Sequence, residues 1–257
     1  MPTSPFTIHR FEEVDSTNDW LAAAARDGAP DKTVAVADFQ LRGRGRLERE
    51  WQAPPRSGLL CSVLLRVALD APLRHLATVA VALGALEACR DAASLEVGLK
   101  WPNDLVVSDR KLGGILAETD GAEAQDGSVA VVVGLGVNLT WSGPTGVGAT
   151  CIQDETGTTV GRDELLDAYL ARLSPRAEQL GASEGRARLL GDYRAALVTI
   201  GRDVRVELSG DAFTGVATAL TDEGHLVVRT DAGSRVVTAG DVVHVRAAGT
   251  GHAGPHE

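Results

Sequence analysis

The sequence has few cysteines, few aromatic residues, few lysines and no excess of positive charge. Its 257 residues include three cysteines and 4% aromatic residues, and the formal net charge is −10 with a pI near 5.1. An acidic chain lacks the broad basic face that a phosphate backbone requires, so we expect no nucleic acid partner. Cys61, Cys89 and Cys151 are widely spaced in apolar segments, which predicts buried thiols of a cytoplasmic protein and neither disulfides nor a zinc site.

Membrane-spanning and targeting segments are also missing. No apolar run approaches the length of a membrane span. The first ten residues, MPTSPFTIHR, lack the apolar core and the cleavage site of a signal peptide. We therefore expect no membrane partner.

Several common catalytic motifs are absent. The six histidines show no metal-ligand spacing, and no Gly-x-Ser-x-Gly motif indicates a serine hydrolase. No segment matches the P-loop pattern. Residues 134–139, GLGVNL, lack the third glycine of the dinucleotide fingerprint, and the following WSGP cannot open a helix. If a nucleotide binds, another arrangement must hold it.

The composition is that of a globular protein, with 44% hydrophobic and 23% charged residues. Ser16 predicts the N-cap of an alanine-rich helix that ends at Gly28, with Asp19 placed as in a capping box. Hydrophobic periodicity predicts further helices at 72–90, 163–180 and 184–197, and Pro175 is a potential break in the second of these. The same analysis predicts strands at 6–14, 33–39, 59–67, 97–101, 105–107, 113–118 and 130–133. Because some neighbouring strands are expected to pair through hairpins, the predicted class is α+β, a mixed sheet with helices packed on it.

The pattern changes after Thr199. Residues 201–246 contain short alternating valine-rich runs separated by turns, which predicts a small all-β, barrel-like unit. The last residues are small and polar, which is typical of a disordered tail. We therefore divide the chain into a domain at 1–198, an all-β domain at 199–247 and a tail at 248–257.

A flexible stretch concentrates positive charge within this acidic chain. Residues 42–51, RGRGRLEREW, hold four arginines and two glycines. Glycine permits close approach of the backbone to a ligand, and guanidinium groups suit phosphate or carboxylate oxygens. A solvated basic loop is an equal alternative on this motif alone. Trp51 favours a binding role because it can cover a flat ligand, although it could also anchor the loop to the core.

Lysine is rare, since only three of the 25 cationic residues are lysines, and two of them lie close together in the chain. Lys100 precedes Trp101–Asp104, a Pro-Asn-Asp turn whose amide and carboxylate could coordinate Mg²⁺ or merely cap backbone N–H groups. Lys111 leads KLGGIL, where the two glycines allow a ligand to lie close to the ammonium group. The alternative is an edge-strand lysine that points to water.

These segments, in this order, resemble the biotin–protein ligase family. The matching segments, which fall between about residue 10 and residue 246, are Ser16–Asn18, Gln40 followed by GRGRLEREW, then KWPNDL, KLGGILAE and GLGVNL. The resemblance implies a biotin/lipoate ligase-like catalytic domain and a small C-terminal SH3-like β-barrel. Longer members carry an N-terminal helix-turn-helix, and the matching part here begins near Met1. We therefore expect a ligase that lacks this DNA-binding domain.

The resemblance implies a two-step reaction. The biotin carboxylate attacks the α-phosphorus of ATP to give biotinyl-5′-AMP, and a specific lysine of a biotin carboxyl carrier domain of an acyl-CoA carboxylase then takes the biotinyl group. ATP and Mg²⁺ are the implied co-substrate and ion, and no prosthetic group is implied. A monomer or weak homodimer is expected. The nearest alternatives are a lipoate–protein ligase and a non-catalytic sensor of biotin or biotinyl-AMP.

The same resemblance implies roles for individual residues. The implied catalytic residues are Lys111, Arg46 and Arg44. The implied biotin-binding residues are Ser16, Thr17, Asn18, Gln40, Arg44, Gly45, Arg46, Lys111 and Gly114. The implied ATP- and adenylate-binding residues are Arg44, Arg46, Arg49, Trp51, Asn103, Lys111 and Asn138. Asp104 is the candidate Mg²⁺ ligand. Arg42, Glu48 and Glu50 depart from what the family motif leads us to expect and alter the charge of the loop.

Overall fold

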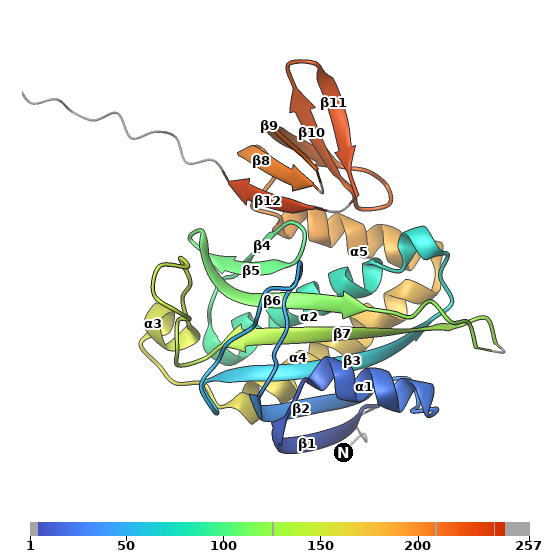
Figure 1. Cartoon of the computed structure of the whole chain (residues 1–257), viewed down its shortest axis with the longest axis vertical. Coiled ribbons are helices and arrows are strands. Elements are labelled where there is room, and N and C mark those ends of the chain that lie inside the picture. The colour runs from blue at the N-terminus through green and yellow to red at the C-terminus, as the bar shows by residue number, and fades with distance from the viewer. Residues whose placement is uncertain (1–4, 125, 209, 239, 245–257) are drawn as a thin grey trace, which may run out of the picture. The chain divides into compact units, whose positions relative to one another are not determined.

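A seven-stranded mixed sheet organises the first part of the chain (Figure 1). The computed structural model describes residues 5–124, 126–208, 210–238 and 240–244. The strands of the sheet are β1 (Thr7–Val14), β2 (Thr33–Gln40), β3 (Gly58–Val67), β4 (Gly98–Lys100), β5 (Asp104–Val107), β6 (Arg110–Glu118) and β7 (Val129–Asn138). Their order is β1-β2-β3-β7-β6-β5-β4, with β1 and β2 parallel and all other neighbours antiparallel.

Helices cover both faces of this sheet. The helix α1 (Thr17–Arg26) packs against β2, β3 and β7, while α2 (Leu76–Ala93) and α4 (Arg162–Glu178) pack together on the other side (Figure 1). A further helix, α5 (Ser183–Ala196), contacts α2 and β4. Strand β3 is buried along nearly its whole length, which explains why its sequence is continuously apolar rather than alternating.

The start of α1 follows from its cap. The Ser16 hydroxyl accepts a hydrogen bond from the Asp19 amide at 3.4 Å, and Gly28 adopts a φ of +88° just after the helix. The capping box is only half formed, because the Asp19 carboxylate pairs with Arg44 instead. One side chain of the first turn is thereby directed toward the basic loop.

Several predicted boundaries are wrong. Helix α2 begins at Leu76 rather than residue 72, since Ala71–Leu73 forms a separate 3₁₀ turn. Strand β7 extends through Asn138, so GLGVN lies on the strand. Helix α4 continues through Pro175, which lies in its last turn. Sequence periodicity also missed the short helix α3 (Ile152–Thr156).

The second part of the chain is a five-stranded antiparallel sheet. The chain divides into two compact units, Met1–Leu197 and Val198–Glu257. The second contains β8 (Asp203–Leu208), β9 (Asp211–Leu220), β10 (Leu226–Thr230), β11 (Gly233–Val237) and β12 (Asp241–His244), in the order β11-β10-β9-β8-β12. The predicted α+β class, a mixed sheet with helices followed by a small β unit, is confirmed. The tail expected at 248–257 lies outside the described residues.

The three cysteines are buried and unpaired, as predicted. Burial raises the pKa of the Cys61 and Cys89 thiols to about 12, which keeps both groups neutral and unreactive. In the described part of the chain, no helix has the length and apolar character needed to cross a membrane.

Candidate active site

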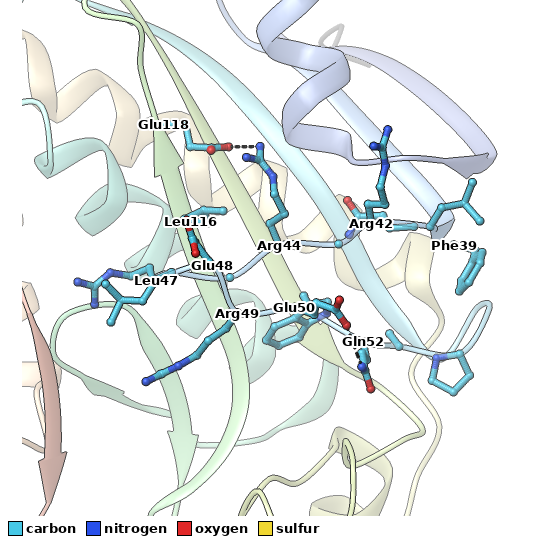
Figure 2. Close-up of a pocket in the computed structure, with 18 of the residues that line it drawn as sticks. Phe39, Arg42, Arg44, Leu47, Glu48, Arg49, Glu50, Gln52, Leu116 and Glu118 are labelled. Atoms are coloured by element: carbon cyan, nitrogen blue, oxygen red, sulfur yellow. Dashed lines mark hydrogen bonds and ion pairs between the residues drawn. The ribbon is translucent and has the colours of Figure 1, made fainter.

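A cavity of about 1010 Å³ lies between the basic loop and the sheet (Figure 2). Residues 39–54 form most of its lining, and Leu116, Ala117, Glu118 and Trp141 complete it. The loop is tied to itself through the Arg44–Glu50 bridge and through a hydrogen bond from the Gly45 amide to the Arg49 carbonyl at 2.6 Å. The stretch that concentrates four arginines therefore forms one wall of the cavity.

A buried polar network lies at the start of α1. Gln40 Oε1 accepts hydrogen bonds from the Thr17 amide at 2.8 Å and from the Thr17 hydroxyl at 3.0 Å. The Ser62 hydroxyl lies 2.7 Å from Thr17 Oγ1 and 2.6 Å from Asn18 Oδ1. Thr17, Asn18 and Ser62 are at most 4% exposed. Burial and mutual hydrogen bonds hold their side chains in fixed positions. Three predicted site residues are therefore brought together, and Ser62 joins them.

Glycines on neighbouring strands make a flat floor beside this network. Gly114 on β6 and Gly136 on β7 are cross-strand partners. A Cβ atom at Gly136 would lie 2.6 Å from the Trp51 ring, and one at Gly114 would lie 3.1 Å from it. Any larger residue at Gly136 would therefore displace the indole. The indole nitrogen of Trp51 is buried and has no hydrogen-bond partner among the described residues.

Lys111 lies at the edge of this floor. Its ammonium group forms an ion pair with Asp104 at 2.6 Å and lies 5.7 Å from the centre of a Trp51 ring. A Cβ atom at Gly114 would be 3.3 Å from Lys111 Nζ, so the glycine leaves the space beside the ammonium group open. The lysine side chain is 39% exposed, which leaves it accessible to a ligand. The edge-strand alternative, a lysine pointing freely to water, does not match these contacts.

The turn after β4 directs Asn103 toward the loop. Asn103 Nδ2 donates to the Ile115 carbonyl at 2.7 Å, and the Asn103 carbonyl accepts from the Ile115 amide at 3.0 Å. This fixes the side chain so that Asn103 Oδ1 accepts from Arg46 at 3.3 Å. The Tyr193 hydroxyl of α5 donates to the Pro102 carbonyl at 3.2 Å and supports the same turn from behind.

The remaining loop arginines differ in their partners. Arg44 pairs with Glu118 at 2.8 Å and with Asp19, whereas Arg42 pairs with Asp15. Arg49 also lines the cavity, and Figure 2 shows its side chain pointing away from those of Arg42 and Arg44. The charge of Arg42, which the family motif does not explain, is thus used to hold the base of the loop.

Six of the fourteen predicted site residues line the cavity, and the other eight, Ser16 and Asn138 among them, lie outside its lining. Ser16 is 2% exposed and acts as the helix cap described above. Asn138 is buried, and its Nδ2 atom donates to the Thr150 carbonyl at 2.9 Å. The Thr150 amide in turn donates to the Lys111 carbonyl at 2.9 Å. Asn138 therefore contacts the segment that supports the strand carrying Lys111.

Sequence reasoning missed four residues of this site, namely Ser62, Glu118, Gly134 and Gly136. Glu118 accepts a hydrogen bond from Asn18 Nδ2 at 2.7 Å, and a Cβ atom at Gly134 would lie 2.4 Å from Asn18 Oδ1. Two signals could have found some of them. One is a lone serine within the apolar run of β3, and the other is the alternation of glycines along β7.

The oxygen atoms of Asp104 and Asn103 suit a metal ion that takes most of its ligands from phosphate and water. The described residues contain no group of three or more His, Cys, Asp or Glu side chains that could hold a metal. Asp104 and Asn103 provide one carboxylate and one amide oxygen at the same turn. This set fits Mg²⁺, which usually binds one or two protein carboxylates together with phosphate oxygens and water.

Comparisons with known proteins agree with this fold. The family model described as Biotin/lipoate A/B protein ligase family matches residues 11–138, and that of the Biotin protein ligase C terminal domain matches residues 199–245. The two matches fall in the two compact units in the same order. The general class is therefore that of the biotin and lipoate protein ligases.

Individual relatives narrow this class. The chain is 38% identical over 244 residues to the biotin–[acetyl-CoA-carboxylase] ligase of Mycobacterium tuberculosis, covering 91% of this chain and 87% of that protein. It is 32% identical over 247 residues to the protein of the same name from Paracoccus denitrificans, covering 89% and 96%. The solved biotin protein ligase of Aquifex aeolicus, in complex with biotin and ATP, matches with a TM-score of 0.78 and 26% identity, covering 94% of this chain and 99% of that one. The chain belongs to the biotin protein ligase family.

Proposed function

We propose that this chain is an ATP-dependent ligase that activates biotin as biotinyl-5′-AMP and transfers it to a lysine of a biotin carboxyl carrier domain. The observation that carries the proposal is the position of Lys111, whose ammonium group lies beside the glycine floor and within ion-pair distance of Asp104. An acyl-CoA carboxylase is the proposed source of the carrier domain, in line with the names of the two curated relatives.

The first step brings two anions together. The biotin carboxylate oxygen forms a bond to the α-phosphorus, and the bond to pyrophosphate breaks. Lys111, Arg44 and Arg46 offset the repulsion between carboxylate and triphosphate, because cations aimed at developing charge are worth most in a site that excludes water. Lys111 has a compact charge, which suits contact with the reacting oxygens. To make this contact, the Lys111 ammonium group must leave its ion pair with Asp104 and pair with the ligand instead.

Bound magnesium would neutralise part of the negative charge of the triphosphate. We assign Asp104 and Asn103 to that side of the site, with Arg49 as a further phosphate contact. Loss of the Lys111 ion pair on ligand binding frees the Asp104 carboxylate for this role. Trp51 is assigned to the adenylate as its apolar cover, and Asn138 supports the strand that carries Lys111.

The biotin ring system is assigned to the buried network. A ureido group offers one carbonyl and two N–H groups, so it needs donors and acceptors at fixed positions. Thr17, Asn18 and Gln40 provide such groups on rigid elements, and Ser16 contributes by capping α1. Gly45 and Gly114 allow close approach to the ligand from the loop and from the floor.

In the second step the acceptor lysine attacks as a neutral amine. Its nitrogen forms an amide with the biotinyl carbonyl carbon and gives up one proton to solvent, while the bond from that carbon to the phosphate oxygen breaks and AMP leaves with the electron pair. The cations that stabilised the first transition state also stabilise this leaving group. Water must stay out until the acceptor arrives, which is the role proposed for the loop when it closes over the adenylate.

The domains, assembly and location are assigned on the same basis. Residues 1–198 are the proposed catalytic domain, because the whole cavity lining lies within them, and 199–247 form the small β domain. A monomer or weak homodimer and a cytoplasmic location are proposed, the latter in line with the three unpaired thiols.

Transfer to an isolated carrier domain tests the proposal. The chain is incubated with ATP, magnesium, and either biotin or lipoate, together with a biotin carrier domain or a lipoyl domain, and the acceptors are weighed by mass spectrometry. We expect one biotinyl group on the biotin carrier and none on a carrier whose acceptor lysine is replaced by arginine. Preferential use of lipoate would indicate a lipoate ligase. Tight biotin binding without any mass gain would indicate a sensor.

A further inference from the structure

The carboxylate of Glu118 joins the two parts of the proposed biotin site. Glu118 is the last residue of β6, and its Oε2 atom accepts from Asn18 Nδ2 at 2.7 Å and from Arg44 at 2.8 Å. Figure 2 shows the contact with Arg44. Asn18 belongs to the buried network and Arg44 to the loop. One oxygen atom therefore contacts both a buried amide and a cation of the loop.

The contact with Glu118 fixes which way the Asn18 amide faces. Asn18 Nδ2 donates to Glu118 Oε2 and also to the Leu116 carbonyl at 3.2 Å. Both of its hydrogens are then used, and Oδ1 must face the Ser62 hydroxyl and Gly134. A flipped amide would place its NH₂ group against a hydroxyl and its oxygen against a carboxylate, which is strongly unfavourable in a buried site.

The contact with Arg44 fixes one end of the loop arginine. Arg44 is held by two carboxylates, Glu118 from β6 and Asp19 from α1. Its side chain is 42% exposed, so a guanidinium edge stays accessible to an anionic ligand while the carboxylates hold it from behind. Charge-assisted hydrogen bonds of this kind are about twice as strong as neutral ones.

We propose that Glu118 is a positioning residue of the biotin site, which sets the orientation of Asn18 and holds Arg44 so that the buried network and the loop act on biotin together. The proposal rests on the proposed function, since it assigns biotin to this cavity. It predicts that loss of the Glu118 charge weakens biotin binding through two residues at once, without contact between Glu118 and the reacting atoms.

Asp19 provides a matched control. It carries the same charge and pairs with the same Arg44, but its hydrogen-bond partners in the structure do not include Asn18. Both carboxylates are partly exposed, at 34% for Glu118 and 53% for Asp19, so neither replacement by the matching amide leaves a fully buried charge unpaired. The comparison of E118Q with D19N therefore isolates the link to Asn18.

The experiment measures biotin dissociation constants by calorimetry, without ATP, for the full chain and both variants. We expect about a ten-fold weaker affinity for E118Q and no more than about two-fold for D19N, because a hydrogen bond to a charged group is worth more than a neutral one. Equal affinities of E118Q and D19N would overturn the proposal. If the unchanged chain does not bind biotin, the proposed function itself fails, whatever the variants do.

Two further readouts separate positioning from a general structural role. Biotin should protect the loop arginines from trypsin in the unchanged chain, and E118Q should need about ten-fold more biotin for the same protection. The Arg44→Gln change should weaken biotin binding alone but add little in the E118Q background. Additive effects, or unchanged protection, would contradict the proposal.

If E118Q does not fold, E118D keeps the charge on a shorter stem, and we expect it to lose part of the biotin affinity. Full affinity in E118D would likewise contradict the proposal.

Discussion

The buried network at the start of α1, which we call the base of the site, and the loop that lines the cavity are built in contrasting ways. The base consists of Thr17, Asn18 and Ser62, which are almost fully buried and hydrogen-bonded to one another. In the loop, Leu47 is 63% exposed, and Leu47 and Glu48 adopt φ values of +55° and +59°, which are unfavourable for residues other than glycine. The base is buried and internally hydrogen-bonded, whereas the loop is exposed and holds two residues in an unfavourable backbone conformation.

This difference matches the two tasks of the proposed reaction. Recognition of a neutral ring system needs fixed donors and acceptors, which a buried network provides. Charge neutralisation over a triphosphate, followed by release of AMP, needs groups that can close and open. Lys111 lies where the two regions meet, since its strand belongs to the sheet and its ammonium group lies beside Trp51 of the loop.

The largest effect is expected from Lys111→Ala, which removes the cation shared by both regions. We expect a fall of about 10³-fold in biotin-dependent ATP–pyrophosphate exchange, because one preorganised charge at a reacting centre commonly contributes this much. Lys32→Ala is the control, since Lys32 pairs with Glu178 and neither residue contacts Asp104 or lines the cavity. Exchange that persists at full rate in Lys111→Ala would remove the central catalytic assignment.

The next largest effect tests the rigidity of the base. A Cβ atom at Gly134 would lie 2.4 Å from Asn18 Oδ1, so Gly134→Ala must displace Asn18. We expect biotin affinity to fall by at least about 30-fold and the free energy of unfolding by roughly 1–3 kcal/mol. The matched change Gly191→Ala lies in α5 with nothing within 4 Å of the new Cβ atom, and it should leave binding intact. Calorimetry measures the biotin affinity of both variants, and thermal unfolding measures their stability. Equal biotin affinities of the two variants would contradict a rigid base.

A smaller effect is expected in the loop. Trp51→Ala removes the indole that covers the glycine floor, so water should reach the bound adenylate more easily. We expect the lifetime of bound biotinyl-5′-AMP to shorten by about ten-fold, with biotin affinity changed by less than about three-fold. Trp20→Phe, on α1 beside Phe11, is the control. A change in biotin affinity without a change in adenylate lifetime would place Trp51 in the base rather than in the cover.

The smallest effect concerns the support of the Asn103 turn. Burial raises the pKa of the Tyr193 hydroxyl, and the charge of Arg46 opposes this only in part, so the hydroxyl remains a protonated donor to the Pro102 carbonyl. Tyr193→Phe should lower the free energy of unfolding by about 1 kcal/mol, with exchange activity reduced by no more than about three-fold. A loss of exchange comparable to that of Lys111→Ala would show that the turn depends on this hydroxyl far more than its single hydrogen bond indicates.

The sequence predicted the parts of the site whose signals are local. The N-cap at Ser16, the glycine–arginine loop and Lys111 beside two glycines can each be found within a few residues. Glu118 could not be placed in this way, because its role depends on strand order and on the docking of α1. The lone serine in the apolar run of β3 marks Ser62 as unusual, but its partners also depend on that docking. Asn18 and Glu118 are separated by 100 residues, and only the folded sheet brings them together. Helix α3 was missed because five residues are too few to show a helical period.

Detection of the enzyme-bound intermediate tests the central claim most directly. The chain is incubated with biotin, ATP and magnesium in the absence of any acceptor, denatured, and its small-molecule fraction is analysed by mass spectrometry. The account predicts biotinyl-5′-AMP at close to one equivalent per chain, and far less of it for Lys111→Ala. Biotin bound at one equivalent, with no adenylate formed in the presence of ATP, would contradict the claim that this cavity joins the two anions.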